Sequence, residues 1–364
     1  MATILQTMPQ WLLWMPVATL ACCGLSASDN SAGAEQPRDP VPAGPVERIA
    51  GDQGLKPLYY PKRDQRAAAV LDLSAATFLL NNSSNSNPTK ERDCKTGDLP
   101  TNKQPLNLFS APGLRVKGGL IRGTVPLGSD WQYTYCNSAA VNLRQSPRVT
   151  VDGIRIGNAW DGIRVGQQSD DFVVRNAWLS DVRDDGVEND HLLSGRIENS
   201  LFDGLLQAVA LMPNKAVNAG PSRGTLTINA SLFLSRDDPF RGRQRFGSLA
   251  KSDQRAPALR IQRSIIAIDS ASGTTWPEHW ANGWAKMQYA SDNLLLWLSD
   301  RPVPTTLPLP RTGFRIVTGA QARAIWKEAR QNWINCHPQV ARLPGDPPSR
   351  PGQCRTRNFG GSLG

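Results

Sequence analysis

The feature that most constrains this chain is a short apolar strand that recurs along its middle at a nearly fixed interval. Val151, Val174 and Ile197 are spaced 23 and 23 residues apart, and Ile228 and Ile261 follow after 31 and 33 residues. A fixed period of this size indicates a solenoid, in which each repeat packs on its neighbours. The two longer steps predict loops inserted into otherwise regular coils.

A second strand series keeps step with the first. It comprises residues 161–165, 185–189 and 207–211, which begin 24 and 22 residues apart. Short strands at this period have the dimension of a parallel β-helix, whose equivalent strands stack about 4.8 Å apart. A β-sandwich is the alternative, but it needs two-residue hairpin turns that this sequence lacks. We therefore predict an all-β fold, a right-handed parallel β-helix (solenoid) with a helical C-terminal flank.

The last hundred residues differ from the repeats. Trp276, Trp280 and Trp284 recur every four residues and predict a helix that begins at Pro277 after a Thr275 cap. Residues 323–333 have the pattern of a second amphipathic helix. The tryptophan face either packs on the solenoid or offers a platform for sugar rings.

The first 28 residues carry no charged side chain, and residues 11–25 are almost continuously apolar. This run is short for a transmembrane helix, which needs about 20 residues, and predicts a signal peptide. Cys22 and Cys23 at its end also allow a lipoprotein signal, with the lipid anchor as the membrane contact. We expect an exported protein that is periplasmic, outer-membrane-anchored or extracellular.

Composition divides the rest of the chain. Residues 29–55 lack apolar periodicity and predict a disordered linker. Residues 56–300 are assigned to the parallel β-helix, and residues 301–364 to a C-terminal cap or flank.

Four cysteines follow the signal segment, and an even number in an exported chain predicts disulfides. Of the three connectivities, local pairing is preferred, which joins Cys94 to Cys136 and Cys336 to Cys354. No zinc-ligand spacing is present among the cysteines and the three histidines.

The chain is basic, with 41 Lys and Arg against 31 Asp and Glu and a net charge of +10. Such a balance favours anionic partners. An exported, disulfide-bearing chain rarely meets nucleic acid, so we expect an acidic polysaccharide as the partner and no nucleic acid.

An acidic set on the second strand series is the strongest candidate for chemistry. If the coils are in register, Asp161 and Asp185 lie one above the other, with Asp184 beside them and Glu188 and Asp190 nearby. Carboxylates this close repel, so one keeps its proton while another stays ionised, as general acid and base catalysis requires. Inverting glycosidases place two carboxyls about 6.5–9.5 Å apart, a distance that neighbouring coils can provide. Ca²⁺ binding and a purely turn-forming role beside glycine are the alternatives.

Two motifs carry a resemblance to a known family. The stretch Gly157-Asn158-Ala159-Trp160-Asp161-Gly162-Ile163 and the stretch Arg183-Asp184-Asp185-Gly186-Val187 resemble the Asn-Thr-Asp-Gly-Ile and Gly-Asp-Asp-Cys-Ile motifs of polygalacturonase-type glycoside hydrolases. More broadly, the chain is similar to the pectin-lyase-like β-helix superfamily. The resemblance implies that Asp184 is the general acid and that Asp161 and Asp185 position and activate the water.

The chain also departs from this pattern. Gln207 stands where those hydrolases carry the histidine of a Gly-His-Gly motif, and their later Arg-Ile-Lys clamp has no counterpart in register. Arg260-Ile261-Gln262 is similar to that clamp but belongs to the other strand series.

A basic loop, residues 235–255, is the second candidate. Arg236, Arg241, Arg243 and Arg245 could grip a uronate chain, because Arg pairs bidentately with carboxylates. In a lyase, an arginine of this loop could also abstract the proton beside a uronate carboxylate. Alternatively, the loop is an ordinary solvated surface loop without a role in binding. We assign further substrate contacts to the following residues: Gln207, His191 and Glu188.

Together these patterns predict a carbohydrate-active protein that hydrolyses an acidic, uronate-containing polysaccharide without a cofactor. The alternatives are a Ca²⁺-dependent polysaccharide lyase and a non-catalytic carbohydrate-binding or structural β-helix.

Overall fold

The computed structural model describes residues 44–81, 102–125, 127–128, 130–131, 138–213 and 220–355. The predicted signal peptide, most of the predicted linker, Cys94 and Cys136 lie outside the described residues.

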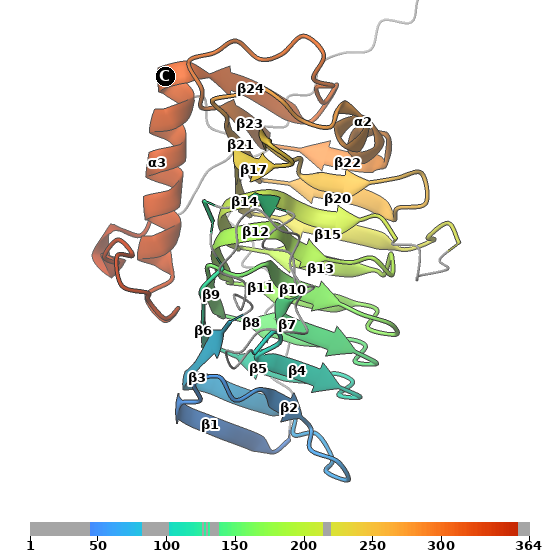
Figure 1. The fold of residues 1–364 in the computed structure, drawn as a ribbon, viewed down its shortest axis with the longest axis vertical. Helices are drawn as coiled ribbons and strands as arrows, with labels where there is room; N and C mark the ends of the chain where they lie inside the picture. Colours follow the sequence, from blue (N-terminus) through green and yellow to red (C-terminus); the bar gives the residue numbers. More distant parts are fainter. Residues whose placement is uncertain are drawn as a thin grey trace, which may run out of the picture. The chain divides into compact units, whose positions relative to one another are not determined.

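The described chain winds into a parallel β-helix with three faces (Figure 1). Face 1 consists of β2(Leu58–Tyr60), β4(Leu106–Phe109), β7(Ala139–Arg144), β10(Asp161–Val165), the second halves of β12(Trp178–Glu188) and β14(Leu201–Leu211), and β19(Ala250–Ser252). Face 2 consists of the first parts of β1(Val46–Asp52) and β3(Val70–Leu80), then β5(Arg115–Lys117), β8(Thr150–Asp152), β11(Phe172–Arg175), β13(Gly195–Glu198), β15(Thr225–Asn229), β20(Ala258–Gln262) and β22(Met287–Ser291). Face 3 consists of the last parts of β1 and β3, then β6(Leu120–Gly123), β9(Arg155–Gly157), the first halves of β12 and β14, β16(Leu232–Arg236), β21(Ile265–Asp269), β23(Asn293–Trp297) and β24(Phe314–Thr318).

The register confirms the repeat predicted from the sequence. On face 2, Val174 pairs with both Val151 and Ile197, and the pairing continues through Ile228 to Ile261. On face 1, Asp185 pairs with Gln207 and Val187 pairs with Ile163. The inward side chains of these strands form one continuous apolar interior, so a one-residue slip of any coil would turn its apolar residues outward.

Buried serines tie the coils together at the corner between faces 2 and 3. The Ser200 backbone N–H donates to Ser231 Oγ, and the Ser231 N–H donates to Ser264 Oγ, each at 3.2 Å. The residues just before them, Asn199, Ala230 and Arg263, adopt positive φ, which turns the chain sharply. The ladder satisfies backbone donors that the corner would otherwise bury unpaired.

The solenoid extends beyond the range expected at both ends. Strand β1 begins at Val46, inside the stretch predicted as linker, and β24 lies inside the predicted flank. Outside the three faces, β17(Asp238–Phe240) and β18(Arg243–Arg245) form a separate antiparallel hairpin.

In the described part of the chain, two α-helices complete the fold, together with the short 3₁₀ turn η1(Pro351–Gln353). Helix α2(Pro277–Ala285) begins where predicted, but its N-cap is Trp276 and not Thr275. Helix α3(Gly319–Cys336) runs alongside face 3 (Figure 1) and covers outward apolar residues there, among them Trp178, Leu201 and Leu232. The predicted Cys336–Cys354 disulfide joins the end of α3 to η1. No helix in the described part of the chain is long and apolar enough to span a membrane.

Candidate functional site

Asp161, Asp184 and Asp185 come together where faces 3 and 1 meet, and we call this set the acid corner. One carboxylate oxygen from each residue lies within 4.8 Å of the others, and all three residues are buried. Strand β12 crosses this corner with a register irregularity between Val182 and Asp185. That irregularity places two consecutive aspartates, Asp184 and Asp185, at the same corner as Asp161 of the preceding coil.

Two cations contact the acid corner from the outward ladder of face 1. Arg164 Nη2 donates to Asp161 Oδ2 at 2.8 Å, and Arg164 Nε donates to Glu188 Oε2. Lys251 Nζ lies 3.5 Å from Asp185 Oδ2. The Asp185 backbone N–H donates to Asp161 Oδ1 at 3.3 Å, whereas Asp185 Oδ1 is buried with no hydrogen-bond partner among the described residues.

Burial raises the pKa of all three carboxyls. The pKa of Asp161 rises well above its usual range because of burial and repulsion from Glu188, which Arg164 opposes. The pKa of Asp185 rises well above its usual range because of burial and repulsion from Asp184, which Lys251 opposes. Burial also raises the pKa of Asp184, against the effect of Lys251. The three carboxyls therefore hold their protons to a higher pH than isolated aspartates do, which is a property required of a general acid.

Arg183, next to the acid corner in sequence, joins two loops. It is fully buried, and its Nη1 donates to Asp238 Oδ1 at 3.0 Å and also to the Leu127 carbonyl. Its Nη2 donates to the Pro239 carbonyl at 3.1 Å. Burial raises the pKa of Asp238 to about 6, although Arg183 opposes this rise. The β17–β18 hairpin is thereby fastened to the strand that carries Asp184 and Asp185.

A row of aromatic rings extends from the acid corner to helix α2. The centroid distances are 5.1 Å from Trp160 to Trp131, 5.1 Å from Trp131 to Phe240, and 5.0 Å from Phe240 to Trp276. The Arg245 guanidinium lies 4.7 Å from the centre of the Trp276 ring, a cation–π contact. Trp131 also lowers the pKa of Asp184, so the row reaches the acid corner.

The predicted substrate-binding residues differ in how close they lie to the acid corner and in whether their polar groups are already bonded. Gln207 pairs in register with Asp185 and is buried, but its Oε1 already accepts from the Ser248 N–H at 2.8 Å. Glu188 adjoins the corner through Arg164. His191 is partly buried, and burial together with Arg144 lowers its pKa.

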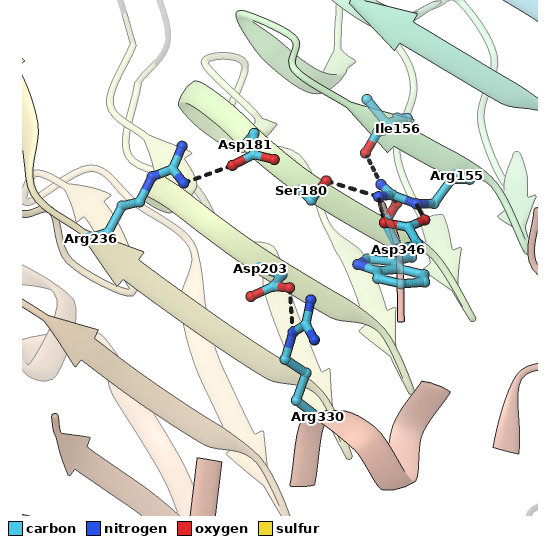
Figure 2. A network of polar contacts seen from close by, with 9 residues as sticks. Arg155, Ile156, Ser180, Asp181, Asp203, Arg236, Arg330 and Asp346 are labelled. Atoms are coloured by element: carbon cyan, nitrogen blue, oxygen red, sulfur yellow. Dashed lines mark hydrogen bonds and ion pairs between the residues drawn. The ribbon is translucent and has the colours of Figure 1, made fainter. Parts of the chain in front are cut away.

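The four predicted arginines take different positions. Arg241 lies over Phe240 at 5.5 Å, and Arg245 joins the aromatic row. Arg243 is exposed on β18. Arg236 pairs with Asp181 on face 3 at 2.7 Å (Figure 2) and so belongs to a different set of contacts.

The tryptophan stripe of α2 mainly packs on the solenoid. Trp280 is buried, and its Nε1 donates to Thr275 Oγ1 at 3.0 Å. Trp284 is partly buried and donates to the Pro308 carbonyl at 2.8 Å. Of the three, Trp276 joins the aromatic row beside the acid corner.

Sequence reasoning missed Arg164, Arg183 and Trp131 as members of this site. Arg164 could have been found, because the predicted register places it next to Glu188 on the outward ladder. Arg183 and Trp131 could not, because their roles depend on loops that fold back from distant parts of the chain.

The carboxyl spacing limits what the corner can do. The three oxygens lie closer than the 6.5–9.5 Å expected of inverting carboxyl pairs, so an attacking water would sit beside the pair and not between them. Ca²⁺ takes about six to eight oxygen ligands. Arg164 and Lys251 already occupy one oxygen each of Asp161 and Asp185, so the donor set fits this ion poorly.

Comparisons with known proteins found no matching family model, no matching curated protein and no matching solved structure. The functional argument therefore rests on the residues of this chain.

Proposed function

We propose that the protein cleaves an acidic, uronate-containing polysaccharide by hydrolysis at the acid corner. The observation that carries the proposal is the presence of three buried carboxyls from adjacent coils, within 4.8 Å, that share raised pKa values. A purely structural cluster would be expected to pair each carboxylate with a cation. Here an excess of carboxyls is maintained, and such an excess supplies acid and base in one place.

The roles follow from the environment of each carboxyl. Asp184 has a raised pKa and forms no ion pair with a described residue, so it is proposed to donate the proton to the leaving oxygen. Asp161 is held by Arg164 and by the Asp185 N–H, and it would position the attacking water together with Asp185. The resemblance to polygalacturonase-type motifs supports this assignment and places the chain among pectin-lyase-like β-helices as part of the proposal.

The surroundings favour an anionic sugar chain. Arg241 and Arg245 lie on aromatic rings of the row that reaches the corner, which offers both flat apolar surfaces and positive charge. The net charge of the whole chain, +10, is also positive and favours an anionic partner. The uncharged first 28 residues and the Cys336–Cys354 disulfide support export to an oxidising compartment. A lipid anchor at Cys22 or Cys23 stays an alternative to free export.

Two other functions are distinguished by one assay. The clustered oxygens and the unpartnered Asp185 Oδ1 are the features that would favour a Ca²⁺-dependent lyase. The assay incubates the protein with a panel of uronate polysaccharides, with Ca²⁺ or chelator, and reads new reducing ends and the ultraviolet absorbance of unsaturated uronates. Hydrolysis predicts reducing ends without absorbance and no effect of chelator. Absorbance that chelator abolishes would assign a lyase, and no signal across the panel would assign a binding or structural protein.

Asp184→Asn tests the proposed acid. We expect turnover to fall about 10²- to 10⁴-fold, the usual contribution of a general acid. Asp181→Asn is a matched control, because it lies on the same strand but its side chain is 41% exposed and pairs with Arg236 on face 3. Equal turnover by wild type and Asp184→Asn would reject the assignment of Asp184.

A further inference from the structure

A cavity lies away from the acid corner, at the C-terminal end of face 2. It has a volume of about 650 Å³ and lies between helix α2, strand β22 and the segment that leads to β24. Strand β22 pairs with β20 on one side and with no described strand on the other. The volume falls within the range of about 300–1,000 Å³ that is usual for ligand sites.

Three aromatic side chains contribute to the wall of this cavity. Trp284, Tyr289 and Phe314 line it, and the centroids of Trp284 and Phe314 are 5.4 Å apart. The Trp284 N–H is already bonded to the Pro308 carbonyl, so this tryptophan presents its ring and not its donor. Tyr289 is 44% exposed, so its ring is accessible to a ligand from the solvent. Ring faces of this kind suit the apolar faces of sugars.

The charge around the cavity has one sign. Arg311 lines it, and the described lining residues include no Asp or Glu. Arg260, on the neighbouring coil, lies 5.6 Å from the centre of the Tyr289 ring, is exposed, and forms no ion pair with any described residue. An occupant with both flat apolar faces and carboxylates would match these side chains.

The outward ladder of face 2 leads directly to this cavity. Arg196, Thr227, Arg260 and Tyr289 are successive register partners on neighbouring coils. Coils stack about 4.8 Å apart, so these side chains form one line, in which Arg196 pairs with Glu198 and Arg260 forms no ion pair with a described residue. An extended chain that enters the cavity can follow this line.

We propose that the cavity, with Arg260 and Tyr289, is a second binding site for uronate oligosaccharides, separate from the acid corner. The choice of uronates rests on the proposed function. The site lies on another face from the acid corner, so its effect is to hold the polymer and not to cleave it.

Isothermal titration with hexagalacturonate and hexaguluronate tests the proposal in the Asp184→Asn background, where cleavage does not interfere. We expect two ligands per chain for the parent and one for Tyr289→Ala and for Arg311→Gln. Tyr59→Ala is the matched control, because Tyr59 is also exposed, at 55%, but lies on β2 in an early coil. Turnover of short oligosaccharides should be unchanged in Tyr289→Ala in the wild-type background.

The outcomes separate the two proposals. In one outcome the protein turns over polymer and binds one ligand per chain, and Tyr289→Ala still binds that ligand. This outcome would overturn the second site and keep the hydrolase. In another outcome the protein binds one ligand, Tyr289→Ala abolishes this binding, and no polymer is turned over. This outcome would keep the second site and reject the hydrolase. Equal binding of a neutral hexasaccharide, or no binding of either uronate, would overturn the second site.

Discussion

The acid corner and the surface where α3 meets face 3 both bury charged groups, but they balance them differently. On and beside face 3, Arg155, Arg236 and Arg330 each pair with a different aspartate (Figure 2). Arg155 binds Asp346 through Nε at 3.0 Å and Nη2 at 2.8 Å, and Arg330 binds Asp203 at 2.6 Å. Arg155 also lies 4.2 Å from the centre of the Trp178 ring, which α3 covers. These matched pairs fix the C-terminal segment to the solenoid.

At the acid corner the carboxyls outnumber the cations. Asp161, Asp184, Asp185 and Glu188 share Arg164 and Lys251, and the pKa of each of the three aspartates is raised. Burying unmatched charge costs free energy that matched pairs avoid. The contrast indicates that the pairs on face 3 stabilise the fold, whereas the acid corner carries unmatched carboxyls, as the proposed acid and base catalysis requires.

Breaking a matched pair should give the largest loss of stability. Asp346→Ala leaves the Arg155 guanidinium, whose side chain is 1% exposed, without its partner. We expect the free energy of unfolding to fall by about 3–5 kcal/mol, the usual cost of an unpaired buried charge. Chemical denaturation measures it.

Asp181→Asn is the control for this loss. It removes a partner of Arg236 from a pair whose side chains are 31% and 41% exposed, so a change below about 1 kcal/mol is expected. A loss below about 1 kcal/mol in Asp346→Ala as well would mean that the pairs on face 3 do not fasten the C-terminal segment.

The sequence predicted the coils well because the repeat is recorded in the inward side chains. Val151, Val174 and Ile197 must face the interior in every coil, so their spacing gives the register directly. The stacking of Asp185 on the coil of Asp161 followed from the same register.

The sequence could not predict contacts that depend on distant segments. Trp178 and Leu201 have the same apolar character as core residues, yet they face outward and are covered by α3 more than a hundred residues later. Arg183 has the pattern of a surface charge, and it is buried because the hairpin beginning at Asp238 folds over it. Local pattern contains no information on either event.

Buried carboxyls with raised pKa values, at the acid corner and at Asp238, predict that stability falls as pH rises. The pKa of Asp238 is raised to about 6 in the folded protein, above the value near 4 of an unfolded aspartate. Between these two values the folded state binds more protons, so stability is present at the lower pH and is lost as pH rises. Deprotonation of Asp238 alone lowers the free energy of unfolding by on the order of 2–3 kcal/mol between pH 4 and 6. Burial raises the pKa of Asp161 and Asp185 too, which adds to the loss in the same direction.

Unfolding titrations from pH 4.5 to 8 measure this dependence. We expect the free energy of unfolding to be higher at pH 5 than at pH 7.5, and Asp238→Asn, which resembles the protonated acid, to flatten the curve. Stability that rises steadily from pH 4.5 to 8 would contradict the excess of carboxyls at the corner.

The smallest effect distinguishes the two regions most directly. Asp185→Asn removes one carboxyl from the acid corner, and the amide resembles the protonated form that burial and Asp184 favour. Lys251 keeps Asp184, Asp161 and Asp190 as neighbouring carboxyls that favour its charged form, so it is not left without a partner. We expect the free energy of unfolding at pH 7.5 to rise by about 1 kcal/mol and to match wild type near pH 4.5. If the free energy of unfolding instead fell by about 3 kcal/mol, as expected for Asp346→Ala, the carboxyls of the acid corner would be matched by cations as on face 3. The raised pKa values would then be a consequence of burial in the fold and would not support catalysis.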